Sequence, residues 1–392
     1  MPPVCASEHG EKTVNGYPFR SETERETGLL RQAPFWYAVC VMRVLFIADR
    51  LTYDGRSDYA LNLARGLKEA RIDLQFALTG GELRGQLDAL KVENYLIKHN
   101  FFSFRKLVRF LREFKPEVVH VTSEQALDPA RRIARALRRS YLLTVHDLLD
   151  AEATHLQESE VQGVIVANED LRETLVNRVH VPKEKIRLIA RGIDLDAFDI
   201  AAPHFEHRMP VIGCMGRFTA GKSHEHFLRA ARMVIDAGRE ALFLVAAHGG
   251  EERQLRRAIR DLKLREAVTI ATPQAAARKL YAAMDIVVLP AEKATSSKTA
   301  LEAMASRRPV IAIVAGDLLH LVRAEENALA VEPGDAEGLA RAITRLLSEP
   351  EFARELGERG RAFVTQKYPL ARMIEHTIAL YEEVVRGEFP RR

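Results

Sequence analysis

DIVVLPAEKATSSKTALEAMA, residues 285–305, continues after two residues into RPVIA, which ends at Ala312. The first part contains a short apolar run, 286–289, that predicts a buried parallel strand. A loop rich in serine and threonine, 294–299, leads into strong helix formers without a β-branched residue, so we expect a helix from about Ser297. The residues at 309–312 predict the next strand. The stretch therefore predicts a strand-loop-helix-strand unit of an α/β fold.

Such a unit predicts an anion site. The helix N-terminus at the carboxyl edge of a parallel sheet presents backbone N–H groups that no helix carbonyl accepts, and it attracts negative charge. Glu302 lies one turn into the expected helix and is flanked by Leu301, Ala303 and Met304. A lone carboxylate among apolar residues needs a partner. A ribose or sugar hydroxyl is one candidate, and an internal salt bridge is the other.

At these residues the chain resembles the retaining glycosyltransferases of the GT-B fold, family 4 (glycosyl transferases group 1). The resemblance covers nearly everything from Met42 to Arg386. It implies an α/β protein with two Rossmann-like domains that face each other across a cleft, and a C-terminal helix that crosses back to the first domain. In that family the corresponding loop and helix hold the diphosphate and ribose of a nucleotide-sugar. The resemblance therefore implies donor binding by Thr295, Ser296, Ser297, Lys298, Thr299 and Glu302.

The length of 392 residues suits two domains of ordinary size. The first residues are polar and lack apolar periodicity, so we expect disorder there. A start at Met42, where strand-like sequence begins, is an alternative. Together with the resemblance, these features predict an extension (1–41), an acceptor domain (42–198), a linker (199–210), a donor domain (211–366) and a returning helix (367–392).

Composition indicates a folded globular protein and argues against several other classes. Hydrophobic residues make up 47% of the chain, as in folded globular proteins, and the formal charge of +4 is too mild to indicate nucleic-acid binding. The three cysteines form no CxxC pair, which fits a reducing cytoplasm and predicts no zinc site. No stretch reaches the ~18 apolar residues of a membrane-spanning helix. We expect a cytoplasmic protein, either soluble or peripheral on the inner face of the membrane.

In the first half, the opening strand and helix contain no G-x-G-x-x-G, so a dinucleotide fingerprint is absent. Gly55 lies in the expected loop 49–58, where relatives approach the donor phosphate, but a plain turn remains open. His146 follows the expected strand 141–145 at the carboxyl edge, where open α/β sheets bind ligands. The resemblance implies that His146 touches the donor sugar near the reaction centre; a purely structural histidine is the alternative.

In the second half, Gly216 and Arg217 begin a glycine-containing loop that ends at Lys222, just before an expected helix. Two cations and a helix N-terminus suit a diphosphate, although solvated cations on a surface loop remain open. The resemblance implies that Arg217 and Lys222 bind the donor pyrophosphate and offset the charge of the leaving group. We expect His224 and His226 on the surface of the helix that follows.

The chain departs from the family at one acid. Relatives carry two glutamates eight positions apart, and counting back eight positions from Glu302 gives Ala294. In the family the first glutamate contacts the donor sugar, so its loss bears on the sugar more than on the nucleotide.

Two basic helices are expected in the first half, at 101–115 and 130–140. The first has apolar positions at helical spacing and four cations on its other side. Such charges commonly form a solvated face. The alternative is docking on an anionic membrane surface.

The function that these features predict is transfer of a hexosyl unit from a nucleoside-diphosphate sugar to a hydroxyl of a glycan, lipid-linked or small-molecule acceptor. By resemblance, the anomeric configuration is retained and the products include cell-envelope polysaccharide. We expect no metal, no nucleic acid and no cofactor other than the donor substrate. A non-catalytic nucleotide-sugar-binding scaffold, favoured by Ala294, is the alternative. A nucleotide-sugar epimerase is a further one, but it needs acid–base residues that the sequence does not place.

Overall fold

The computed structural model describes residues 42–98, 100–146, 156, 159–203, 205, 209–217, 223–248, 252–271, 277–289, 297–314 and 318–390. Residues 42–392 form one compact unit. The extension predicted over 1–41 lies outside the described residues. The bounds predicted for the domains and the linker stay a prediction.

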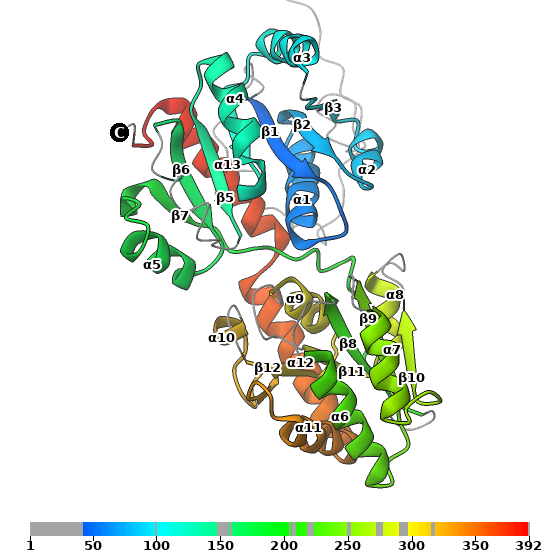
Figure 1. The fold of residues 1–392 in the computed structure, drawn as a ribbon. Helices are drawn as coiled ribbons and strands as arrows, with labels where there is room; N and C mark the ends of the chain where they lie inside the picture. The colour runs from blue at the N-terminus through cyan, green and yellow to red at the C-terminus, as the bar shows by residue number, and fades with distance from the viewer. Residues whose placement is uncertain are drawn as a thin grey trace, which may run out of the picture. The chain divides into compact units, whose positions relative to one another are not determined.

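The first half builds a seven-stranded parallel sheet in the order β3-β2-β1-β4-β5-β6-β7 (Figure 1). Its central strands are almost wholly apolar and buried, because helices cover both faces of a parallel sheet. The strands are β1 (Arg43–Arg50), β2 (Asp73–Gly80), β3 (Glu93–Leu96), β4 (Val118–Val121), β5 (Tyr141–Val145), β6 (Val161–Val166) and β7 (Ile186–Leu188). The helices of this half are α1 (Gly55–Glu69), α2 (Arg84–Ala89), α3 (Phe101–Phe114), α4 (Leu127–Leu137) and α5 (Glu169–Asn177).

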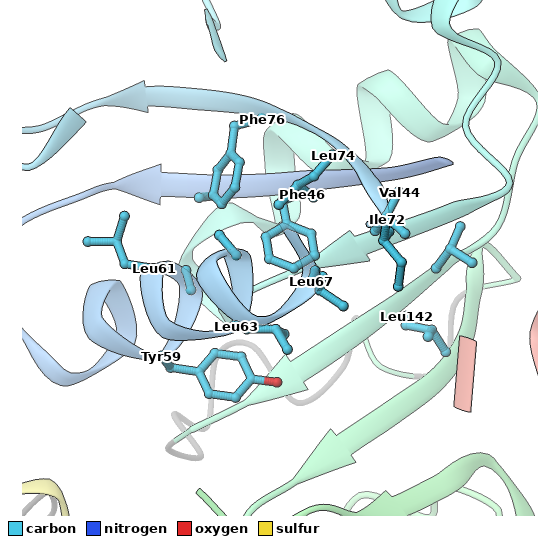
Figure 2. Packing of buried hydrophobic residues seen from close by; sticks show 14 of the residues in the cluster. Val44, Phe46, Tyr59, Leu61, Leu63, Leu67, Ile72, Leu74, Phe76 and Leu142 are labelled. Atoms are coloured by element: carbon cyan, nitrogen blue, oxygen red, sulfur yellow. The ribbon is translucent and has the colours of Figure 1, made fainter. Parts of the chain in front are cut away.

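Aromatic and branched side chains fill the space between this sheet and α1. Phe46 and Phe76 come from the paired strands β1 and β2, and their rings meet edge-on at 4.9 Å between centroids. Figure 2 shows them facing Leu63 and Leu67 of α1, with Tyr59 on the same helix. Burial of these side chains, at about 1.5–3 kcal/mol each, drives the helix onto the sheet.

The second half repeats the plan with a six-stranded parallel sheet in the order β10-β9-β8-β11-β12-β13. Its strands are β8 (Val211–Arg217), β9 (Leu242–His248), β10 (Val268–Ala271), β11 (Ile286–Leu289), β12 (Val310–Ile313) and β13 (Leu329–Val331). Its helices are α6 (Ser223–Asp236), α7 (Glu252–Asp261), α8 (Ala277–Ala283), α9 (Ser297–Ala305), α10 (Leu318–Leu321), α11 (Ala336–Ser348) and α12 (Pro350–Lys367). The predicted strand at 286–289 and the helix start at Ser297 are confirmed. The two parallel sheets also confirm the predicted α/β class with two Rossmann-like halves.

The last helix, α13 (Leu370–Arg386), belongs to the core of the first sheet. It packs against α1 and β4, and in Figure 1 it is the red helix against the blue and green strands. Gly387 caps it in the left-handed conformation (φ 74°), which glycine adopts without strain. The sequence spaces Ile374, Ile378, Tyr381 and Val385 as one apolar stripe of this helix, but Val385 is 43% exposed, so that register is partly wrong. The buried face is instead formed by Met373, Thr377, Leu380, Tyr381 and Val384.

The start of α1 also corrects the sequence-based prediction. Gly55 was expected inside a loop, but it opens the helix. The reason is a cap: an oxygen of the Asp54 side chain accepts a hydrogen bond from the backbone N–H of Ser57 at 2.8 Å. This satisfies one of the N–H groups that a helix start leaves without a carbonyl partner. Gly55 is therefore held in place by a helix, with Asp54 as the residue that begins it.

Candidate active site

Both sheets carry their candidate residues where the strand order reverses. In the first sheet β1 and β4 are neighbours although β2 and β3 lie between them in the chain, and in the second sheet β8 and β11 are neighbours in the same way. The loops after two such strands diverge to opposite faces and leave a crevice at the carboxyl edge. Gly55 follows β1, while Gly216 and Arg217 end β8. The sequence patterns thus lie at the two places where this fold binds ligands.

In the first half, a buried carboxylate connects three segments: the short helix after β4, the start of α1 and the end of β5. Glu124, in a short 3-10 helix (Glu124–Ala126) after β4, is 3% exposed. Its Oε1 lies 2.7 Å from Nη2 of Arg56 in α1. Its Oε2 accepts a hydrogen bond from the backbone N–H of His146 at 3.2 Å. A buried charge needs such partners, so this pair fixes the start of α1 against the end of β5.

His146 itself has both ring nitrogens engaged. Nε2 lies 2.9 Å from the carbonyl oxygen of Thr122; since a carbonyl only accepts, Nε2 carries the proton. Nδ1 is then the acceptor, and it receives a hydrogen bond from Nη2 of Arg191 at 3.3 Å. Burial first, and then the positive charges of Arg191 and Arg56, hold the pKa of His146 well below its usual value. The imidazole is therefore neutral, and both of its nitrogens already have partners within the protein.

Gly55 lies close to the guanidinium of Arg191. A Cβ atom on Gly55 would lie 3.0 Å from Nη1 of the Arg191 guanidinium, tighter than ordinary contacts. Arg191, Gly55 and His146 therefore form one cluster at the carboxyl edge of the first sheet.

In the second half, Glu302 is 5% exposed in α9. It accepts a hydrogen bond from the hydroxyl of Tyr281 at 3.0 Å and lies 3.5 Å from the Lys298 ammonium, which also pairs with Asp58. Burial raises the pKa of Glu302, and Lys298 offsets that effect only in part. Burial lowers the pKa of Lys298, but the two carboxylates outweigh it and the pKa is raised. Of the two partners considered for Glu302, the structure shows the internal ion pair; the ribose role stays a prediction.

Lys298 lies at the start of α9, next to Ser297 and Thr299. The strand before this helix, β11, pairs in parallel with β8, so the two strands end at the same edge of the sheet. Several predicted site residues fall in these loops. Lys222, Thr295 and Ser296, together with Ala294, lie outside the described residues, and of Gly216 and Arg217 only the place on β8 is described. The roles predicted for all of them stay predictions.

Sequence reasoning missed most of the residues that hold this site together: Asp58, Glu124, Arg191 and Tyr281. Glu124 alone had a usable signal, because it follows a buried strand at the edge where ligands bind. His224 was expected on the helix surface. It is instead half-buried on α6, and burial lowers its pKa to about 4. Among the described histidines, cysteines and acids, no group of three or more is arranged to hold a metal ion.

Two family models match the chain. "Glycosyltransferase Family 4" matches residues 53–197, and "Glycosyl transferases group 1" matches residues 209–349. The two ranges together cover more than half of the chain: the first includes β2–β7 of the first sheet, and the second includes all strands of the second sheet. The fold and these matches define a glycosyltransferase-type protein of the GT-B class. The chain belongs to family 4 of the glycosyltransferases, the family also described as group 1.

Curated relatives agree with this membership at moderate identity. An uncharacterised glycosyltransferase of Methanocaldococcus jannaschii is 26% identical over 59% of this chain and 64% of its own length. The alpha-D-kanosaminyltransferase of Streptomyces kanamyceticus is 25% identical over 57% of this chain and 60% of its own. A lipopolysaccharide core biosynthesis glycosyltransferase, LpsE of Rhizobium meliloti, is 32% identical over 38% of this chain and 43% of its own. The chain thus spans less than two-thirds of the length of these relatives.

Solved structures share the fold over almost all of the chain. HepE of Anabaena, in complex with UDP and glucose, has a TM-score of 0.77 at 18% identity, covering 87% of this chain and 100% of its own. A glycosyltransferase of Rickettsia africae has a TM-score of 0.76 at 20% identity, covering 88% and 99%.

Proposed function

We propose that the protein transfers a hexosyl unit from a nucleoside-diphosphate sugar to an acceptor hydroxyl, with retention of the anomeric configuration. The main support is the place of Lys298 and Glu302 in the first turns of α9, at the carboxyl edge of β11 and beside β8. A buried acid there suits a ribose hydroxyl. A cation and a helix N-terminus suit a diphosphate.

The chemistry asked of such a site is mainly electrostatic. As the glycosidic bond of the donor breaks, negative charge develops on the departing diphosphate. Arg217, Lys222 and the N–H groups at the start of α9 would stabilise that charge, and removal of one such group typically costs about 2.7–4 kcal/mol of barrier. Lys298 is already close to Asp58 and Glu302, so a bound diphosphate would compete with those carboxylates for its charge.

His146 would help to orient the donor sugar by position and packing and not by proton transfer. Its ring is neutral and both nitrogens are engaged, so proton transfer by this histidine has no support from the geometry. A nucleotide-sugar epimerase, which needs acid–base groups at the sugar, is disfavoured for the same reason. Transfer with a stabilised leaving group makes no such demand.

The donor and acceptor classes rest on relatives. HepE is described in complex with UDP and UDP-glucose, so uridine nucleotides are the first donors to test. The likeness to LpsE favours an acceptor that belongs to cell-envelope polysaccharide.

Glu302→Gln is expected to abolish stabilisation by nucleotide. A nucleotide at 100 times its dissociation constant should add about 2.7 kcal/mol to the free energy of unfolding of the wild type. The variant keeps the shape of the side chain but removes the charge that would hold the ribose. Thermal unfolding with UDP, GDP, ADP and their common sugars measures the difference.

The matched control is Glu252→Gln, which removes the acid of a similarly spaced pair with Arg256 on the exposed face of α7. It should leave the nucleotide shift unchanged. An equal shift in Glu302→Gln and wild type would refute the ribose role. If no nucleotide shifts the wild type, the transferase proposal is refuted, and a degenerate scaffold that has lost nucleotide binding is favoured. Donor turnover in the presence of crude membrane extract separates a transferase from a nucleotide-binding scaffold.

We also propose that α3 docks on an anionic membrane surface. Phe101 and Phe102 begin the helix and are 64% and 83% exposed, while Leu107, Val108 and Leu111 face the core. The guanidinium of Arg105 lies 5.5 Å from the centre of the Phe101 ring. Exposed aromatic rings beside cations fit the boundary between lipid headgroups and acyl chains. Among the described residues, no helix is long and apolar enough to cross a bilayer.

The second basic helix contributes less than the sequence suggested. In α4, Arg131 pairs with Asp128, and Nε of Arg135 lies 2.6 Å from Glu160. Arg132 stacks over Phe104 of α3 at 4.6 Å. These arginines are largely engaged within the protein, so α3 presents the docking surface.

Replacing both Phe101 and Phe102 by alanine is expected to lower the affinity for anionic vesicles about tenfold or more, because two buried rings are lost from the interface. Co-sedimentation with vesicles of anionic and of zwitterionic lipid measures this. Leu319→Ala is the control, since Leu319 is 58% exposed on α10 in the other half. Equal binding of the wild type to both lipids would exclude the proposal.

A further inference from the structure

The core of the first sheet contains a chain of four polar side chains joined by hydrogen bonds. His120 of β4 is at its centre: its Nδ1 lies 2.6 Å from the hydroxyl of Tyr381, and its Nε2 lies 2.7 Å from the hydroxyl of Thr144. The hydroxyl of Tyr59 lies 3.1 Å from that of Thr144. All four side chains are at most 4% exposed. Burial lowers the pKa of His120 to about 3, so the ring is neutral.

This chain of four ends against the candidate site. The ring of Tyr59 meets the ring of His146 edge-on, with 5.0 Å between centroids and 77° between planes. The other end, Tyr381, belongs to α13. Helix α13 and His146 are therefore linked through Tyr381, His120, Thr144 and Tyr59.

The same helix holds His146 from a second side. The backbone N–H of Leu370, at the start of α13, donates to the carbonyl of Ile193 at 3.0 Å, and the N–H of Ile193 donates to the carbonyl of Tyr368 at 2.8 Å. The N–H of Gly192 lies 3.3 Å from the sulfur of Met373. These contacts fix the backbone next to Arg191, whose guanidinium donates to His146.

We propose that Tyr381 and His120 are positioning residues, which fix the orientation of His146 from α13 through Thr144 and Tyr59. Apolar side chains would fill this space equally well, whereas hydrogen bonds have preferred directions and select one orientation of each ring. The ring of Tyr59 is thereby held against His146, while Arg191 holds the opposite side. The inference rests on the proposed transferase function, because His146 matters for activity only if a donor sugar binds beside it.

Tyr381→Phe tests this by removing one hydroxyl and keeping the ring. We expect kcat to fall about tenfold, with the KM for donor changed less than about twofold, because orientation of the bound sugar is affected more than its binding. The ring resonances of His146 in NMR spectra of the histidine-labelled protein should shift as well. Tyr381→Phe combined with Tyr59→Phe should lose less activity than the product of the single losses, as members of one network do.

Thr377→Val is the matched control. Thr377 is also fully buried on α13, but its hydroxyl bonds within the helix, to the carbonyl of Met373 at 2.7 Å. This variant should keep the wild-type kcat and His146 resonances while losing thermal stability. The proposal is overturned if Tyr381→Phe leaves the resonances unchanged, or if Thr377→Val moves them equally. Absence of transfer by the wild type with every donor counts against the proposed function alone, since the resonances decide the positioning role without activity.

Discussion

Replacing Lys222 by alanine is expected to lower kcat by about 10²–10³-fold, the typical effect of losing one group that stabilises developing negative charge. In the sequence Lys222 lies between β8 and α6, and β8 pairs with β11, the strand that precedes α9. A positive charge at this place would act mainly as the diphosphate departs, so kcat should fall more than donor affinity. Steady-state transfer with a UDP-sugar, together with UDP binding measured by calorimetry, separates the two effects.

Two further variants sharpen that result. Lys222→Arg keeps the charge and should recover part of the rate. Lys279→Ala removes an exposed lysine from α8 in the same half of the chain and should match the wild type. A Lys222→Ala enzyme with unchanged kcat would remove this residue from the catalytic role.

Gly192→Ala is expected to lower the free energy of unfolding by about 1–3 kcal/mol, because it forces an extra methyl into a closed contact. A Cβ atom at this position would lie 2.5 Å from the Cα atom of Leu370 and 3.1 Å from the carbonyl oxygen of Pro369. Both neighbours are backbone atoms, so no rotation of a side chain relieves the clash, and the start of α13 must shift. Urea unfolding followed by circular dichroism measures the loss.

Gly85→Ala gives the comparison for that experiment. Gly85 lies in helix α2, and a Cβ there would meet no atom within 4 Å. Alanine should therefore be neutral or stabilising by up to about 1 kcal/mol, since it restricts the unfolded chain and favours helix. Equal stability of Gly192→Ala and wild type would show that α13 does not need this close approach.

The sequence predicted elements whose signals are local. The apolar run of β11, the helix formers of α9 and the apolar run of β12 lie within thirty residues of each other. All three elements were predicted from the sequence. The start of α1 was missed although Asp54 is a good capping residue, because a glycine at position 55 is more typical of a loop than of a helix start. In α13, Val385 fits an apolar stripe in the sequence, but the helix turns it to solvent.

The contacts inside the site could not be predicted from local sequence, because the residues that contact each other are far apart in the chain. Arg191 and His146 are 45 positions apart, and His120 and Tyr381 are 261 apart. The sequence alone does not show which opposite charge a charged side chain will pair with. That pairing is decided by the strand order, which brings distant loops to the same edge of the sheet. For Glu302, the sequence identified the unusual acid and gave an internal ion pair as one of two candidate partners, and the structure shows Lys298 and Tyr281.

The place of α13 in the first core bears on how the chain acquires its structure during synthesis. Leu380 and Tyr381 pack with residues of β1 and α1, and Phe389, 1% exposed, lies where a side chain on Gly163 would collide with it. The ribosome therefore makes the whole second sheet before it supplies the last residues that the first sheet buries. Bringing α13 back to the first sheet closes a long loop of chain, which carries an entropic cost. Until α13 has been synthesised, apolar surface of the first sheet stays exposed. The half that is made first is thus the half that is finished last.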